Sequence, residues 1–171
     1  MILVSRCLAG DCCRWDGGTN LVPELRALVE AGLAVTVCPE VSGGLSTPRH
    51  PSEILDGQVI NNAGEDVTEC FRKGAEAALR VFEENHCDYA VLKAKSPSCG
   101  CGLVHNGKFD GGLVPGNGIA AQLLLDHGYQ VVTETAWLKN QASENSDSCQ
   151  FQQLPSVLHM CPRIHRLPAA S

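Results

Sequence analysis

Short runs of aliphatic residues alternate with longer stretches in which apolar residues recur every three or four positions. The runs are typical of buried strands and lie at residues 2–8, 33–37, 88–94 and 130–133. The amphipathic stretches predict helices at residues 21–31, 68–85, 118–127 and 135–140. In the longest one the apolar side chains follow helical spacing, at Phe71, Ala75, Ala78, Leu79 and Phe82. Strands and helices are therefore expected to follow one another along the chain.

Polar and glycine-rich segments separate these elements. They predict loops at residues 9–19, 40–51 and 95–114, and a small hairpin within residues 55–64. After residue 140 no clear period remains, and prolines, histidines and cysteines are scattered to the end. We therefore expect one domain at residues 1–140 and a C-terminal appendage at residues 141–171, whose role the sequence leaves open.

The alternation of strand and helix predicts an α/β fold, a Rossmann-like and mainly parallel sheet flanked by helices, with the C-terminal appendage attached. In such sheets the functional site lies beyond the carboxyl ends of the strands. Cys7, Cys38 and Cys99 each lie at or just after a predicted strand end. We expect these three cysteines to meet at one edge of the sheet.

The composition of the chain argues against several classes of function. The chain has 171 residues with 13 basic and 19 acidic side chains, and its net charge is −6. Polynucleotide binding depends on clustered basic residues, so it is not expected. No apolar run approaches the roughly 18 residues of a membrane helix, and the first residues lack the layout of a signal peptide. We expect a cytoplasmic protein with no membrane contact, and the oligomeric state is left open.

Cysteine is unusually frequent, with ten in the chain. In a reducing compartment such a number indicates metal binding or catalysis more than disulfides. Paired Cys-x2-Cys motifs of zinc or ferredoxin sites are absent, so a metal site has to be assembled from distant cysteines. Three converging cysteines can hold a [4Fe-4S] cluster with one iron free of protein ligands. The alternative is that Cys7 and Cys38 are small core residues.

Several polar residues near the strand ends are candidates for chemistry. Glu40 follows Cys38 by two positions and can handle protons, although a loop carboxylate is often only exposed. Ser96 and Ser98 can act as nucleophile and hydrogen-bond donor, or can simply form a turn around Pro97. The candidates for substrate binding are Arg14, Asp16, Arg49, Lys95, Ser98, Asn117 and Gly118. Asn117 and Gly118 open a predicted helix, whose free amides suit a phosphate.

Three motifs occur in order along the chain. They are Ser5–Gly10 with Cys13–Gly17, Cys38–Val41 with Gly43–Leu45 and Thr47–Arg49, and Ser96–Gly100. Together they resemble a known family, the thiouracil desulfidases, across about residues 2–135. The chain departs from the family pattern at Arg6 and in the additional Cys12. Neither departure removes a cysteine that the motifs share.

The resemblance implies a [4Fe-4S] cluster held by Cys7, Cys38 and Cys99, with one open iron. It leaves the role of Cys13 open, because relatives often carry valine there. It further implies that Glu40 handles protons, that Ser96 is an active-site serine, and that sulfur leaves a thiolated uracil compound without net redox change. Among small thiopyrimidines we favour 4-thiouridine monophosphate over free 2-thiouracil. A non-catalytic iron-sulfur carrier or sensor and an open-iron dehydratase are the alternatives.

Overall fold

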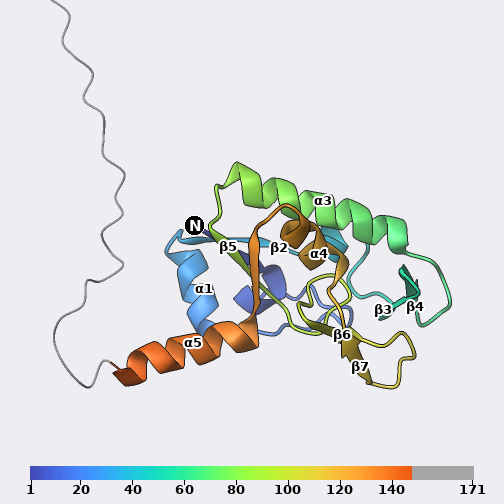
Figure 1. The fold of residues 1–171 in the computed structure, drawn as a ribbon. Coiled ribbons are helices and arrows are strands. Elements are labelled where there is room, and N and C mark those ends of the chain that lie inside the picture. The colour runs from blue at the N-terminus through green and yellow to red at the C-terminus, as the bar shows by residue number, and fades with distance from the viewer. Residues whose placement is uncertain (148–171) are drawn as a thin grey trace, which may run out of the picture.

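The computed structural model describes residues 1–147, which form a parallel sheet with helices on both faces (Figure 1). The strands are β1 (Ile2–Ser5), β2 (Ala34–Val37), β3 (Ser52–Leu55), β4 (Gln58–Asn61), β5 (Tyr89–Leu92), β6 (Leu103–His105), β7 (Leu113–Pro115) and β8 (Gln130–Thr133). The helices are the 3₁₀ turn η1 (Arg6–Ala9), α1 (Pro23–Glu30), α2 (Pro39–Ser42), α3 (Thr68–Glu84), α4 (Ile119–Asp126) and α5 (Glu134–Asp147).

The main sheet has the strand order β2-β1-β5-β8, and every neighbouring pair is parallel. Ser5 pairs with Val37, and Leu92 pairs with Thr133, so the strands end close to one level. All four residues of β1 are buried, as expected for a central strand covered on both faces. The predicted α/β fold with a mainly parallel sheet flanked by helices is confirmed.

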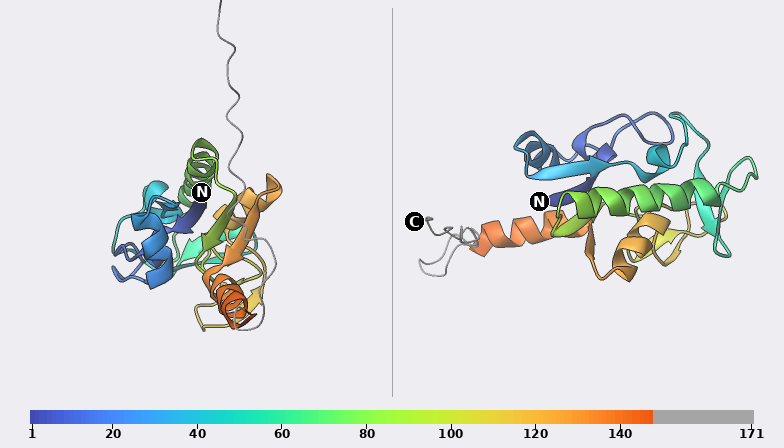
Figure 2. Two further views of the ribbon diagram at one scale, coloured as in Figure 1. Left: turned by 90° about the vertical axis from the view of Figure 1, so that its left-hand side faces the viewer. Right: turned by 90° about the horizontal axis from the view of Figure 1, so that it is seen from above.

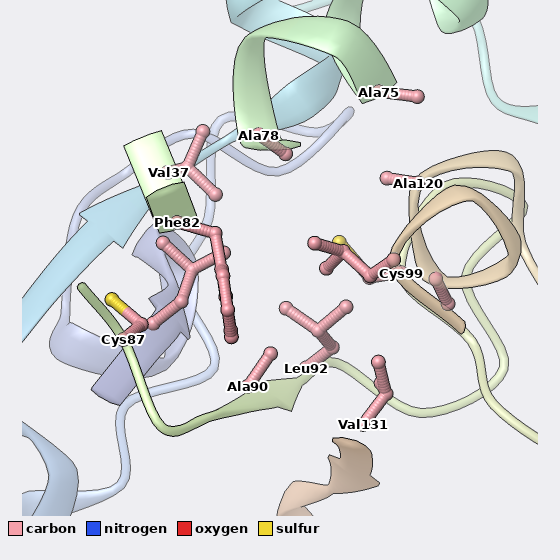
Figure 3. Close-up of a cluster of buried hydrophobic side chains, with 13 residues drawn as sticks. Val37, Ala75, Ala78, Phe82, Cys87, Ala90, Leu92, Cys99, Ala120 and Val131 are labelled. Atoms are coloured by element: carbon pink, nitrogen blue, oxygen red, sulfur yellow. The ribbon is translucent and has the colours of Figure 1, made fainter. Parts of the chain in front are cut away.

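Successive side chains of each strand point to opposite faces of the sheet, where they pack into two separate hydrophobic cores. On one face Leu3, Ala90 and Leu92 pack with buried residues of α3 and α4 (Figure 3). On the other face Ile2, Val4 and Val91 pack with residues of α1 and with Trp137 of α5. The views from two further sides show α3 and α5 on opposite sides of the sheet (Figure 2).

Helix α3 is also packed against the four-residue helix α2 through two glycines. A Cβ added at Gly74 of α3 would collide with the backbone carbonyl of Pro39, and one added at Gly43 would collide with the carbonyl of Cys70. This close approach fixes α2 directly after the end of β2.

Three features differ from the sequence-based expectation. The segment 40–51 begins in α2, the segment 95–114 contains the hairpin β6–β7, and the last helix continues to Asp147. The second hairpin lies beside the first one, β3–β4, at one end of the sheet (Figure 1). Of the predicted appendage, residues 148–171 lie outside the described residues. Within residues 1–147 no helix is both long and apolar enough to cross a membrane.

Candidate functional site

A cavity of about 620 Å³ opens at the carboxyl ends of the parallel strands. Segments that follow β1, β2 and β5 line one side of it, and residues of the two hairpins line the other. The lining includes Cys7, Cys13, Cys38, Cys99, Glu40, Ser96, Arg14, Arg49 and Lys95, all of which sequence reasoning singled out. This cavity therefore lies beyond the strand ends, where the sequence predicts the functional site.

Four cysteine thiols converge on this cavity. Cys7 lies in the turn η1 after β1, Cys38 precedes α2 after β2, and Cys99 lies in the loop after β5. Cys13 comes from the loop before α1 and is buried, with its thiol hydrogen-bonded to the thiols of both Cys7 and Cys38. The sulfur of Cys38 also lies 3.8 Å from the carbonyl oxygen of Cys13. The structure thus brings the three predicted cysteines together and adds Cys13 between two of them.

Most of these thiols resist ionisation in the protein alone. Burial raises the pKa of Cys99 to about 12. The hydrogen bond to Cys13, followed by burial, raises the pKa of Cys38 far above its ordinary value. For Cys13 the bond from Cys38 lowers the pKa, but the bond to Cys7 and burial outweigh it and the pKa is raised. Cys7 alone has a lowered pKa, because Cys13 donates a hydrogen bond to it.

This group of thiols fits an iron-sulfur cluster in its chemistry. Thiolates are the ligands that iron-sulfur clusters require, and a bound metal removes the proton from a coordinating thiol whatever its pKa in the free protein. Within residues 1–147 no three His, Cys, Asp or Glu side chains form a group that could hold a single metal ion. A multi-iron cluster is larger than one ion and suits sulfurs set around a cavity.

Glu40 lies on α2 beside the thiols, and Arg49 holds it there. The Nε of Arg49 donates to Oε2 of Glu40 at 2.8 Å, and the two side chains are only 7% and 16% exposed. The negative charge of Glu40 contributes to the raised pKa values of Cys38 and Cys99. Arg49 also donates to the carbonyl of Cys13 at 3.0 Å, so one guanidinium joins the carboxylate to the cysteine loop.

Ser96 lines the cavity at the start of the loop that carries Cys99. Its Oγ accepts hydrogen bonds from the backbone amides of Ser98 and Cys99, both at 3.1 Å. A hydroxyl that accepts two bonds keeps its own hydrogen for donation. Ser98 is fully buried and lies beside the Cys99 thiol instead of lining the cavity.

Most cationic side chains around the cavity are neutralised by a carboxylate. The pairs are Arg6 with Asp11, Arg14 with Asp16, Arg49 with Glu40 and Lys93 with Glu134. Lys95 is exposed and lines the cavity, and it forms no ion pair with the described residues. Of the predicted cationic contacts, Arg14 and Arg49 therefore have protein partners, whereas Lys95 is free to meet an anion.

The start of α4 lies outside the cavity lining. The amides of Ile119 and Ala120 donate to the carbonyls of Pro97 and Ser98 at 2.9 Å each, so they are not free for a phosphate. Asn117 accepts from the amide of Gly102, and a Cβ at Gly118 would collide with the backbone of Ser98. These residues pack the Cys99 loop onto α4.

The sequence of this chain matches known proteins over most of its length. The family model described as 2-thiouracil desulfurase matches residues 2–136. The chain belongs to this desulfurase family. A curated relative, the uncharacterized protein YbbK of Bacillus subtilis (strain 168), is 42% identical over 144 residues, covering 78% of this chain and 95% of that protein. The resemblance that the sequence motifs indicated is confirmed.

A solved structure extends the comparison to the whole desulfurase fold. It is described as the [4Fe-4S]-dependent thiouracil desulfidase TudS, and it matches with a TM-score of 0.77 and 40% identity. The match covers 85% of this chain and 97% of that chain. The dependence on a [4Fe-4S] cluster is a property of that protein.

The sequence did not predict the residues on the hairpin side of the cavity. Glu53, His105 and Phe109 line it, and the carboxylate of Glu53 accepts a hydrogen bond from the amide of Phe109 at 3.1 Å. It also missed Asn20, whose amide nitrogen lies 3.7 Å from the sulfur of Cys7. Only the folded arrangement reveals these residues, because none of them lies at the end of a strand that the sequence predicts or in a motif with a chemical signature.

Proposed function

We propose that this protein is a [4Fe-4S]-dependent, non-redox desulfidase that converts a thiolated uracil compound to its oxo form and releases sulfide. One observation carries the proposal: cysteines from three strand ends and a carboxylate held by arginine meet in one cavity. Membership in the 2-thiouracil desulfurase family agrees with this chemistry.

Cys7, Cys38 and Cys99 would hold the cluster, because each comes from a different strand end and lines the cavity. Such a cluster, bound through three cysteines, supplies an iron that acts as a Lewis acid toward sulfur. Cys13 lies beside this set without being needed for it. A fourth cysteine ligand would close the iron to substrate.

Glu40 and Ser96 would handle the protons of the reaction. Replacing C=S with C=O consumes one water and gives hydrogen sulfide, so the oxidation level of the carbon does not change. A base has to take a proton from the attacking water, and the departing sulfur has to gain one. Glu40 can do the first because Arg49 fixes one oxygen and the side chain lines the cavity. Ser96 retains a hydroxyl hydrogen to donate.

Among substrates we propose 4-thiouridine monophosphate ahead of free 2-thiouracil. Lys95 supports this choice, because it is the cationic side chain of the cavity lining that the described carboxylates leave free. Lys95→Ala should lower kcat/KM for the nucleotide about tenfold, which is the effect of losing one charged contact. The kcat/KM for the nucleoside 4-thiouridine should not change. Lys95→Arg keeps the charge and serves as the control. Equal losses on nucleotide and nucleoside would contradict the phosphate contact.

One experiment separates the proposed activity from its alternatives. Protein purified without oxygen is analysed for iron and then incubated with a thiolated uracil, with a hydroxylated substrate and with an iron-free acceptor protein. Sulfide release from the thiolated compound supports the desulfidase. Dehydration of the hydroxylated compound, or cluster transfer without sulfide release, would replace it with the dehydratase or the carrier.

We also propose a cytoplasmic location. All eight cysteines among residues 1–147 are free thiols, and several converge on one cavity where oxidation would join them. A reducing compartment preserves such a group. Fractionation of cells that produce the protein, followed by immunodetection, tests this placement.

A further inference from the structure

A continuous set of hydrogen bonds leads from the surface of the first loop to the sulfur of Cys7. The carboxylate of Asp16 accepts from Nε and Nη2 of Arg14 at 3.1 and 2.9 Å. The third nitrogen of Arg14, Nη1, donates to Oδ1 of Asn20 at 2.8 Å. The amide nitrogen Nδ2 of Asn20 then lies 3.7 Å from the sulfur of Cys7.

The chemistry of these groups fixes the direction of the last contact. A guanidinium can only donate hydrogen bonds, so the atom of Asn20 that faces Arg14 has to be the amide oxygen. The NH₂ group must then face Cys7 and can only donate to its sulfur. Asp16 holds the guanidinium with two bonds and is itself held by the amide of Gly18 at 2.9 Å.

The backbone holds Asn20 close to the same cysteine. The amide of Asn20 donates to the carbonyl of Cys7 at 3.0 Å, and the hydroxyl of Thr19 donates to that carbonyl at 2.9 Å. Asn20, Arg14 and Cys7 all line the cavity. The Asn20 amide is therefore fixed at both ends, and its direction toward the sulfur does not depend on a mobile side chain.

We propose that Asn20 is a positioning residue that donates a hydrogen bond to the Cys7 sulfur when that sulfur binds the cluster. Arg14 and Asp16 act through Asn20 and do not contact substrate. A donor to a ligand sulfur withdraws negative charge from it, which favours the reduced cluster and raises its reduction potential. This inference rests on the proposed function, because it assumes that Cys7 is a cluster ligand.

The test is a redox titration of the cluster in protein loaded without oxygen. Asn20→Leu keeps the branched shape of the side chain but removes the donor, and it should shift the midpoint potential to a more negative value. Arg14→Met releases the amide oxygen and should shift it in the same direction by a smaller amount. Asn62→Leu is the matched control, since Asn62 also lines the cavity and should leave the potential unchanged.

Substrate kinetics provide a second readout. If Arg14 and Asp16 act only through Asn20, the KM of Arg14→Met should equal that of the wild type. A midpoint potential in Asn20→Leu equal to the wild-type value would overturn the proposal, and so would a raised KM in Arg14→Met. If Asn20→Leu takes up no iron, the smaller Asn20→Ala, which also removes the donor and adds no charge, decides by the same titration. A wild-type chain that binds no cluster would instead refute the proposed function, which iron analysis shows separately.

Discussion

Cys13 lies in a position that fits two different roles at the site. It is buried among the thiols, with hydrogen bonds to Cys7 and Cys38, while its carbonyl accepts a bond from Arg49. Two roles follow from this position. As a ligand it would close the cluster, whereas as a neighbour it holds the cysteine loop in place. The open iron on which the proposed mechanism depends favours the second role.

Single cysteine substitutions distinguish the two roles. Cys7→Ser, Cys38→Ser and Cys99→Ser should each lose most of the iron, because serine is a poor ligand for these clusters. Cys13→Ser should retain about four irons per chain. Cys87→Ser is the control, since Cys87 is buried in the core at the far end of β5. Iron analysis and the absorption spectrum measure the result, and iron loss in Cys13→Ser would add that residue to the ligands.

Glu40→Gln should lower turnover about 10²- to 10⁴-fold, the usual effect of removing a general acid or base. The cluster should remain, because Glu40 is not a ligand in this account. Glu24→Gln on the exposed start of α1 is the matched control and should keep full turnover. Steady-state kinetics with an iron count check both. A Glu40→Gln protein with undiminished turnover would exclude Glu40 from the proton steps.

At this scale the sequence predicts which residues converge but not what each one contacts. Cys7, Cys38 and Cys99 could be predicted because the carboxyl ends of parallel strands meet at one edge. Cys13 could not, because its place depends on the path of an irregular loop. Arg49 was expected to bind substrate, yet its donors are occupied by Glu40 and by backbone carbonyls.

At the scale of elements, the short helix α2 carries Glu40, and the long helix α3 holds α2 in position. Helix α2 has four residues, too few to be stable alone, and its contact with α3 passes over Gly74. The long helices and the parallel strands could be predicted from their periodicity. Helix α2 and the three-residue strands β6 and β7 could not, because their stability comes from tertiary contacts.

The substitution Gly74→Ala tests this contact, because tight packing and open space predict opposite changes in the free energy of unfolding. Alanine normally stabilises a helix interior by about 1 kcal/mol relative to glycine. Here the added methyl group meets the Pro39 carbonyl, so we expect a net loss of about 1–3 kcal/mol in the free energy of unfolding. Glu76→Ala, at an exposed position of the same helix, should change it by less than about 0.5 kcal/mol. Urea denaturation measures both, and a stabilised Gly74→Ala protein would contradict the tight packing.

At the scale of the whole molecule, the sheet edge and the two hairpins together line the cavity. The strand ends supply the thiols, and the hairpins supply the opposite wall with Glu53, His105 and Phe109. Helix α5 closes the second core through Trp137, which is 8% exposed and donates to the hydroxyl of Tyr89. Residues 139–143, which follow on the same helix, are exposed.

A chain that ends at Asn140 should therefore fold and bind iron as the full chain does. It keeps Trp137 and every cavity residue, and of the described side chains it loses only exposed ones. Trp137→Ala in the full chain should instead cost about 3–5 kcal/mol of stability. Thermal unfolding and iron content compare the two proteins. A truncated chain that is insoluble would show that residues after 140 belong to the core.

The central claim is that this chain exchanges sulfur for the oxygen of water without transferring electrons. The most direct test incubates the cluster-loaded protein, without oxygen or reductant, with 4-thiouridine monophosphate in water labelled with a heavy oxygen isotope. Mass spectrometry of the product and a sulfide assay then follow the same sample. The account predicts label in the new carbonyl and equal amounts of sulfide and oxo product. A requirement for an added electron donor, or an unlabelled carbonyl, would contradict it.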